Sequence, residues 1–288
     1  MAVLLSGCAS SLMDGLLGDS GGTSASSSSS QALSAGLTPD MTAATENAEV
    51  AKLYNEGLAQ LEKGQSKSAV AKFSEVERKY PYSSFATKAI LMQAYASYVA
   101  LRWDDAVIAA TRFVNLHPGH RDAGYAYYLI AVSNYNKIAD TKRDQTATKQ
   151  ALAALEEVAQ RYPGTAYAAD AAAKAVVARD HLAGKEMEVG RFYFRERSYL
   201  AGINRFKRVV TEYRNTSQTP EALYRLAEGY MALGIVSEAQ TAAAVLGHNY
   251  PDSDWYRDAY RLVSSDGQAP VQNDESWISK TFASVNPF

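Results

Sequence analysis

The sequence has few of the residues that crosslink a chain or bind metals. Its 288 residues include a single cysteine, so the chain cannot form an internal disulfide or a zinc site built on several cysteines. Charge is nearly balanced, with 29 Lys and Arg against 31 Asp and Glu. A chain without a basic excess has no field that attracts nucleic acid, so we do not expect nucleic-acid binding. No apolar run approaches the roughly 20 residues that span a bilayer.

Sequence motifs for catalysis are also missing. The chain has no phosphate-binding Walker loop, no Gly-rich dinucleotide turn after a strand and no Ser nucleophile elbow. Two of its four histidines, His117 and His120, lie close together in sequence. They have neither cysteines nor a carboxylate cluster beside them, which favours an exposed turn over a metal site. We therefore expect no enzyme activity, no bound cofactor and no metal.

The one cysteine, Cys8, lies outside the region that we expect to fold. It follows Leu5-Ser6-Gly7, and an apolar residue and two small residues before a cysteine are typical of the lipobox of bacterial lipoproteins. We interpret residues 1–8 as the remainder of a signal peptide with Cys8 as the lipid-modified residue, and residues 9–46, rich in Ser and Gly, as a flexible tether. The alternative is an incidental free cysteine. Acyl chains on Cys8 would anchor the protein to a membrane surface.

A pattern of small and aromatic residues recurs after the tether at the interval of a helical repeat. The first copy has the spacing of a tetratricopeptide repeat, two helices joined by a tight turn, and consists of Tyr54, Gly57, Gly64, Ala69, Phe73 and Pro81. Small residues at Gly57 and Ala69 let the two helices approach closely beside Phe73. Pro118 follows Pro81 by 37 residues, whereas Pro163 follows Pro118 by 45. We expect the extra residues of the third copy, near 137–144, to form a projecting loop.

Five such copies, without segments of strand periodicity, predict an all-α tetratricopeptide-repeat (TPR) solenoid of about five helical hairpins. A non-repetitive helical bundle is the alternative. We assign residues 47–165 to N-terminal repeats 1–3, residues 166–263 to C-terminal repeats 4–5, and residues 264–288 to a tail. A long Ala-rich helix is expected over Tyr167–Ala183. The tail has apolar residues at helical spacing that either cap the last repeat or contact a partner: Trp277, Ile278, Phe282 and Val285.

The register of the repeats also predicts a binding surface. In a TPR stack the first helix of each hairpin lines a concave groove, and repeats 1–3 place six tyrosines there. Rings with few rotatable bonds and a hydroxyl rim suit an extended peptide that contains aromatic residues. The alternative for any single ring is that it packs between helices. The predicted peptide-binding groove consists of Tyr54, Tyr95, Tyr98, Tyr125, Tyr128 and Tyr135.

The fourth copy is more basic than the rest of the chain. Residues 185–214 contain eight basic and four acidic side chains. A solvated helix face explains this run as well as a docking surface for an acidic partner domain does. Arginine is favoured for docking because its guanidinium forms bidentate contacts with carboxylates. The candidate docking residues are Arg195, Arg197, Arg205 and Arg208.

These features together resemble the BamD (ComL) family, lipoproteins of the β-barrel assembly machinery (BAM) in the Gram-negative outer membrane. The resemblance rests on the lipobox, the tether and the repeats with an extended helix between them, and in the repeat region it covers residues 49–263. Its most similar segments are Lys72-Phe73, Tyr80-Pro81-Tyr82-Ser83, Val176–Lys185, Arg191-Phe192-Tyr193-Phe194 and Asn204-Arg205-Phe206.

The resemblance implies a lipid-anchored protein on the periplasmic face of the outer membrane, and Ala9 after the cysteine fits that location. It implies that the N-terminal repeats receive the C-terminal targeting strand of unfolded outer-membrane proteins, whose terminal aromatic residue suits the tyrosine groove. It also implies that the C-terminal repeats bind the periplasmic domains of the barrel subunit, with Arg205 at the contact, and that other BAM lipoproteins are further partners. The alternative is another TPR-containing periplasmic lipoprotein, a scaffold for envelope or peptidoglycan coordination, because a fold does not fix its partner.

Overall fold

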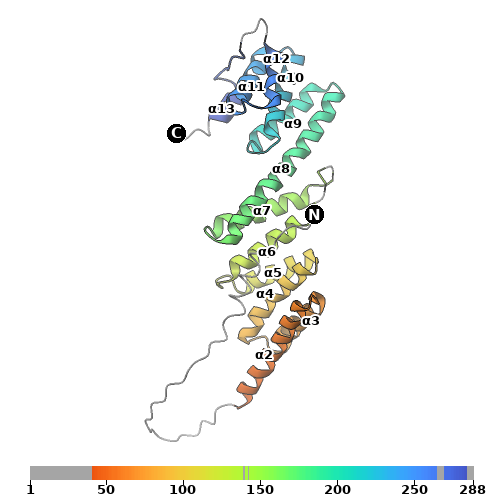
Figure 1. Cartoon of the computed structure of the whole chain (residues 1–288), viewed down its shortest axis with the longest axis vertical. Coiled ribbons are helices and arrows are strands. Elements are labelled where there is room, and N and C mark those ends of the chain that lie inside the picture. The colour runs from red at the N-terminus through yellow and green to blue at the C-terminus, as the bar shows by residue number, and fades with distance from the viewer. Residues whose placement is uncertain (1–40, 139, 142, 265–268, 284–288) are drawn as a thin grey trace, which may run out of the picture.

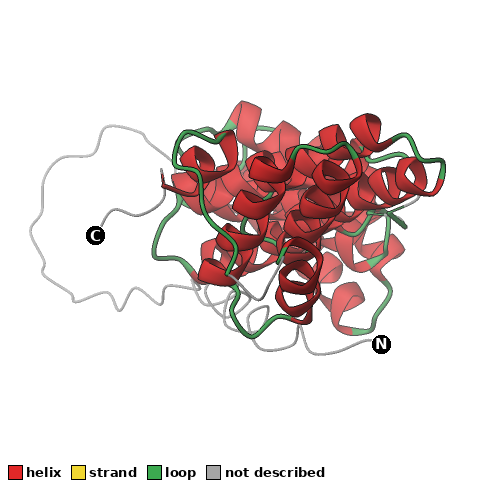
Figure 2. Cartoon of the chain, turned by 90° about the horizontal axis from the view of Figure 1, so that it is seen from above, coloured by secondary structure: helices red, strands yellow, loops and turns green. Residues whose placement is uncertain are grey.

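The computed structural model describes residues 41–138, 140–141, 143–264 and 269–283. Within these ranges the chain forms helices and connecting turns without any strand, stacked along one long axis (Figures 1 and 2). The prediction of an all-α repeat fold is therefore confirmed. Cys8 and most of the predicted tether lie outside the described residues. The first helix within the described residues begins at Met41, so residues 41–46 of the predicted tether are helical.

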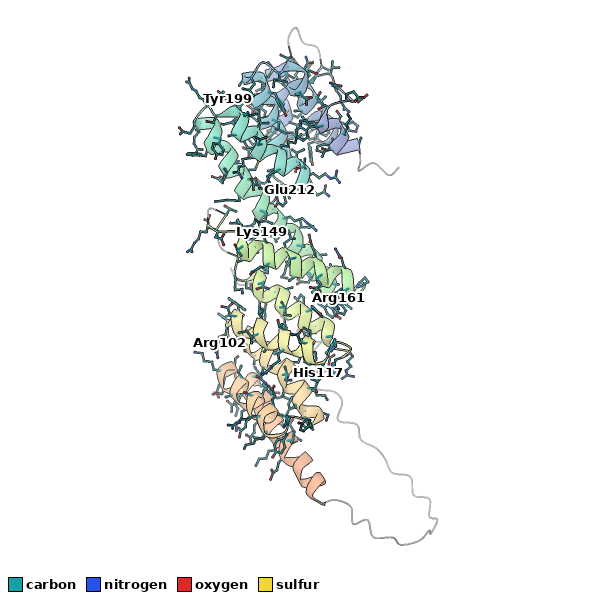
Figure 3. The ribbon with its side chains drawn as sticks, turned by 180° about the vertical axis from the view of Figure 1, so that it is seen from behind. Arg102, His117, Lys149, Arg161, Tyr199 and Glu212 are labelled. Atoms are coloured by element: carbon teal, nitrogen blue, oxygen red, sulfur yellow. The ribbon has the colours of Figure 1, made fainter. Side chains whose placement is uncertain are left out.

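Ten of the helices in the described ranges pair into five successive hairpins, and two shorter helices follow. The hairpins are α2 (Met41–Glu62) with α3 (Ser66–Lys79), α4 (Ser84–Val99) with α5 (Trp103–Leu116), α6 (Ala123–Tyr135) with α7 (Thr146–Arg161), α8 (Ala166–Arg195) with α9 (Tyr199–Glu212), and α10 (Thr219–Ala232) with α11 (Val236–Asn249). They are followed by α12 (Asp254–Val263) and α13 (Trp277–Ala283). Figure 3 labels residues at or near the two ends of α5, α7 and α9, and these second helices lie at successive levels of the stack.

Close contact between the two helices of a hairpin depends on the predicted small residues. A Cβ atom added at Gly57 on α2 would lie 2.7 Å from the ring of Phe73 on α3, so only glycine permits this approach. Phe73 is fully buried, and Phe206 of α9 packs in the same way against Gly190 of α8. The predicted packing of Gly57 against Phe73 is thus confirmed.

One continuous helix, α8, connects the third and fourth hairpins. Its 30 residues extend well beyond the predicted Tyr167–Ala183 helix, because no proline interrupts this Ala-rich sequence. Ala171 and Ala175 near its start pack in a core with residues of α6 and α7. Met187 near its end packs in a separate core with residues of α9 to α11. The helix therefore packs with both predicted halves of the chain.

The extra residues of the third copy connect α6 to α7. This connection runs from residue 136 to residue 145, longer than the connections inside the other hairpins. Its described part is held by the buried side chain of Gln145, whose amide nitrogen donates to the backbone carbonyls of Thr141, at 3.2 Å, and Arg143, at 3.0 Å. A loop is present where the interval between Pro118 and Pro163 predicts one.

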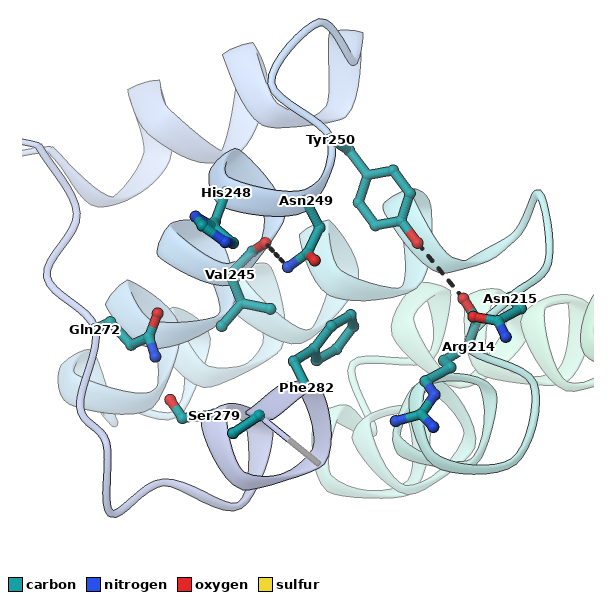
Figure 4. A pocket seen from close by; sticks show the side chains of 10 residues that line it. Arg214, Asn215, Val245, His248, Asn249, Tyr250, Gln272, Ser279 and Phe282 are labelled. Carbon is teal, nitrogen blue, oxygen red and sulfur yellow. Dashed lines mark hydrogen bonds between the residues drawn. The ribbon is translucent and has the colours of Figure 1, made fainter. Parts of the chain in front are cut away.

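The tail packs on the last two hairpins through α13. Ile278 is fully buried in their core, and the indole nitrogen of Trp277 donates to the hydroxyl of Tyr230 at 3.1 Å. The guanidinium of Arg214 donates to the carbonyl of Thr281 at 2.8 Å. Phe282 lies beside a cavity of about 440 Å³ between α11, α13 and the end of α9 (Figure 4). Of the two predictions for the tail, the structure shows a cap on the last repeats.

Candidate functional site

Five of the six predicted groove tyrosines lie on two neighbouring first helices. Tyr95 and Tyr98 are on α4, and Tyr125, Tyr128 and Tyr135 are on α6. Within each helix they are three or seven residues apart, which places them on one face. All five are partly buried. We refer to these five residues as the tyrosine cluster.

The rings of the cluster contact each other and further aromatic side chains. Tyr125 and Tyr128 are stacked with their ring centres 6.2 Å apart. Tyr128 lies 6.1 Å from Tyr167 at the start of α8, and Tyr98 lies 5.2 Å from Trp103 at the start of α5. The ring contacts thus extend from α6 to α8, and Tyr95, Tyr98 and Tyr125 pack against one hydrophobic core that α4 and α6 share.

A charged pair on α8 supplies the polar group next to these rings. The hydroxyl of Tyr128 donates to Asp170 at 2.7 Å, and the ammonium group of Lys174 binds both oxygens of the same carboxylate. We did not predict Asp170 or Lys174 as site residues. The sequence contained a signal for them, because they are the only charged residues between positions 166 and 178 of an otherwise Ala-rich helix.

Burial and the charge of Asp170 keep the cluster in its neutral form. Burial is the main cause that raises the pKa of Tyr98, Tyr125, Tyr128 and Tyr135 above the ordinary phenol value. The negative charge of Asp170 raises the pKa of Tyr98, Tyr128 and Tyr135 further. An ordinary phenol is already uncharged at neutral pH, and the raised pKa values extend this neutral form to higher pH. The neutral hydroxyls both donate and accept hydrogen bonds.

Tyr54 takes a different position from the other five predicted tyrosines. Only 5% of its surface is exposed, and its ring lies between Phe73 and Phe85, at 5.4 and 5.5 Å between ring centres. Within the described part of the chain its buried hydroxyl has no hydrogen-bond partner. The prediction for Tyr54 is therefore corrected: the aromatic rings of α3 and α4 enclose it, so it belongs to the core of the first hairpins.

Two of the candidate docking arginines meet at one carboxylate. Glu186 on α8, whose side chain is 13% exposed, binds Arg208 at 2.8 Å and Arg205 at 3.2 Å. Arg208 also binds Glu212 one helical turn further along α9. Both guanidiniums keep more than a third of their side-chain surface exposed. The partly buried glutamate therefore orients two arginines that still face solvent.

The other two arginines lie at the opposite end of the α8–α9 hairpin. Arg195 lines a cavity of about 260 Å³ with Arg191, Phe194, Arg225 and Glu228. Arg197 is a turn residue with a positive φ of 56°. Because Arg195 is nine residues along α8 from Glu186, it lies about 13 Å from that level of the helix. The four candidate arginines thus form two separate sites instead of one surface.

Metal sites and membrane-spanning helices are both absent from the described residues. In the ranges that the structure describes, no three His, Cys, Asp or Glu side chains come together as a metal site would require. The helices found there are all too short or too polar to cross a bilayer.

The chain is similar to known outer membrane lipoproteins. Residues 46–246 match the YfiO family, described as outer membrane lipoprotein. The outer membrane protein assembly factor BamD of Caulobacter vibrioides is 46% identical over 237 residues, which are 82% of this chain and 78% of that protein. The protein of the same name from Rickettsia prowazekii is 44% identical over 218 residues, 76% of this chain and 87% of that protein.

Similarity to solved structures is more distant. A thermophilic TPR protein of Thermus thermophilus has a TM-score of 0.33 and 16% identity, covering 74% of this chain and 98% of that one. The TPR2AB domain of yeast Sti1 in a complex with an HSP90 peptide has a TM-score of 0.40 and 12% identity, covering 75% of this chain and 82% of that one. The sequence matches, by contrast, extend over most of the chain. The chain therefore belongs to the BamD (YfiO) family of outer membrane lipoproteins.

Proposed function

We propose that this protein is a non-catalytic scaffold of the β-barrel assembly machinery, which captures unfolded outer-membrane proteins and delivers them to the barrel subunit. Its membership of the BamD family supports a role in outer membrane protein assembly. The same membership favours this function over the alternative of a peptidoglycan or envelope scaffold. The single structural observation that carries the proposal is the tyrosine cluster on α4 and α6.

The chemistry of the cluster suits the targeting strand of an outer-membrane protein. Its partly buried rings offer apolar contact area at a small cost in side-chain entropy. Its neutral hydroxyls can pair with the backbone of an extended peptide that is not part of a sheet. An aromatic side chain at the end of such a strand would stack with these rings, and each such pair contributes about 0.5–1.5 kcal/mol.

A direct test measures binding of a fluorescent peptide that corresponds to the C-terminal strand of an outer-membrane protein. We would replace Tyr95, Tyr98, Tyr128 and Tyr135 singly by Ala in the full-length chain and confirm helicity by circular dichroism. At least two variants should bind the peptide about tenfold more weakly, which corresponds to a loss of about 1.4 kcal/mol of binding free energy. Tyr82→Ala is the matched control, because Tyr82 is fully exposed on a turn. Unaltered binding by all four variants would show that the cluster is not the peptide site.

The pair Arg205 and Arg208 is the proposed contact with the periplasmic domains of the barrel subunit. Glu186 orients both guanidiniums, and the remaining donors of each are available to a carboxylate of the partner. The test is recovery of the barrel subunit with the tagged chain from detergent-solubilised envelopes. We expect Arg205→Glu to reduce recovery and Arg257→Glu, at an exposed position of α12, to leave it unchanged. Equal recovery with both variants would place the contact elsewhere.

A covalent lipid on Cys8 is the proposed anchor to the inner leaflet of the outer membrane, and other BAM lipoproteins are the further partners. No cofactor is required for this scaffold function. Cys8→Ser should release the protein from the membrane fraction, whereas the helical fold of the described residues should be retained. Membrane association of Cys8→Ser equal to that of the original chain would contradict the proposed anchor.

A further inference from the structure

Six aromatic side chains elsewhere in the described residues lie under basic side chains of the chain itself. The guanidinium of Arg161 lies 4.4 Å from the ring centre of Tyr127, and that of Arg225 lies 5.2 Å from the ring centre of Tyr224. The ammonium group of Lys207 lies 4.6 Å from the ring centre of Trp277. A cation over an aromatic face is attracted by the negative potential of the π electrons. Such pairs are thus a recurrent element of this structure.

The tyrosine cluster has no such pair in the described ranges. Among the residues that the structure describes, none of the Lys or Arg side chains lies over a ring of the cluster. The five side chains are partly exposed, so the exposed part of each is open to contact with another molecule.

The charged side chains next to the cluster are an ion pair, Asp170 with Lys174. Asp170 accepts the hydroxyl of Tyr128 and retains 32% side-chain exposure. The negative charge of Asp170 is one of the causes that raise the pKa of Tyr98 and Tyr135. Lys174 binds both oxygens of the same carboxylate. A carboxylate has about four lone-pair positions, so Asp170 can accept a further donor besides Tyr128 and Lys174.

We propose that the tyrosine cluster binds a cationic side chain, an arginine or a lysine of the captured peptide, with Asp170 as its counter-charge. This inference rests on the proposed function, because it specifies which peptides the cluster selects. In an extended peptide, residues two positions apart lie on the same side. The preferred ligand is therefore an extended segment with a basic residue two positions from an aromatic residue, so that both side chains reach the rings together.

The test compares three fluorescent peptides that differ at one position, two residues from a phenylalanine. That position holds arginine, its uncharged isostere citrulline, or glutamate. Binding to the full-length chain in detergent micelles is measured by fluorescence anisotropy at low salt. We expect arginine to bind several-fold more tightly than citrulline, and glutamate to bind most weakly, with differences that shrink as salt is added.

Two variants and one control assign the preference to Asp170. Asp170→Asn should abolish the difference between arginine and citrulline while the citrulline peptide still binds. Lys174→Gln should enlarge the difference, because it removes the cation that shares the carboxylate. Glu157→Gln is the matched control, since Glu157 is an exposed carboxylate on α7 that is also paired with a basic residue one turn along its helix.

The outcomes separate this inference from the proposed function. Equal binding of the three peptides, or a preference that Asp170→Asn leaves unchanged, would overturn the cationic site and leave peptide capture intact. A failure of all three peptides to bind would overturn peptide capture itself, and the cationic site with it.

Discussion

Leu101 and Arg197 have the same backbone conformation at the same position of two hairpins. Their φ angles are 59° and 56°, and each lies 17 residues before the residue that ends its repeat, Pro118 and Arg214. In both turns the next residue donates to a carbonyl five positions earlier, at 2.9 Å, which is the hydrogen bond of a Schellman motif. In the first and fifth hairpins this position is glycine, Gly64 and Gly234, again with positive φ.

The second and fourth hairpins have a non-glycine residue at this turn position. We therefore predict that replacing it by glycine stabilises each hairpin. A side chain at positive φ costs about 1–2 kcal/mol, part of which glycine loses again through its greater freedom in the unfolded chain. Leu101→Gly should therefore raise the free energy of unfolding by about 0.5–1 kcal/mol, as should Arg197→Gly. Urea denaturation followed by circular dichroism measures this. The reverse change, Gly234→Ala, should be destabilising although open space surrounds that position. A loss of stability in Leu101→Gly would contradict the strain assigned to this turn.

The close approach of α2 and α3 makes Gly57 sensitive to substitution. Gly57→Ala places a methyl group against the fully buried Phe73 ring, and overpacking of this kind costs about 1–3 kcal/mol. The midpoint of thermal unfolding should fall accordingly. Gly119→Ala serves as the control, because no atom lies within 4 Å of the added Cβ. Equal shifts of the unfolding midpoint in the two variants would show that the approach of α2 and α3 leaves room for a side chain at Gly57.

Attachment of the tail depends on Ile278. Removing most of this fully buried side chain in Ile278→Ala should cost about 2–4 kcal/mol, and the loss should be local to α13 and its contacts. Hydrogen exchange of residues 269–283 is the measurement, and faster exchange is the expected result. Val271→Ala, at an exposed position of the same segment, should leave exchange unchanged. Unchanged exchange in Ile278→Ala would mean that other contacts hold the tail.

The buried tyrosines predict a loss of stability at alkaline pH. Burial raises the pKa of Tyr54 to about 12, above the phenol value of about 10 that applies in the unfolded chain. Because the fold favours the protonated form, this contribution is fully present below pH 10 and is lost as the pH rises through about 12. It amounts to about 2–3 kcal/mol, at 1.36 kcal/mol per pKa unit.

Replacing Tyr54 by phenylalanine isolates this contribution. Tyr54→Phe should show a smaller fall in the free energy of unfolding between pH 9 and pH 12 than the original chain. At pH 7 it should be no less stable, because the hydroxyl that it removes is buried and, within the described part of the chain, unpaired. Urea titrations at several pH values measure both effects. An identical alkaline profile in the two proteins would exclude Tyr54 as a source of the fall.

The hairpins could be predicted from the sequence because their contacts are local. The packing of Gly57 against Phe73 depends on a spacing of 16 residues within one repeat, and the repeat register places such pairs without knowledge of the whole fold. Tyr95, Tyr98, Tyr125, Tyr128 and Tyr135 could be placed on neighbouring first helices for the same reason.

Contacts between distant segments could not be predicted in this way. Asp170 meets Tyr128 across 42 residues, and the path between them includes the insertion that breaks the repeat interval. Tyr54 faces the core because Phe85 of the next hairpin closes over it. Arg195 and Arg208 are close in sequence but lie at opposite ends of a hairpin, since the chain reverses direction at Arg197.

The central claim is that the tyrosine cluster contacts outer-membrane proteins on their way to the barrel subunit. The most direct measurement is photocrosslinking in cells from a benzoylphenylalanine residue that replaces Tyr135, compared with the same residue in place of exposed Tyr82. We expect crosslinks to unfolded β-barrel precursors from position 135 and far fewer from position 82. Crosslinks from position 135 to division or cell-wall proteins, without barrel precursors, would contradict this claim.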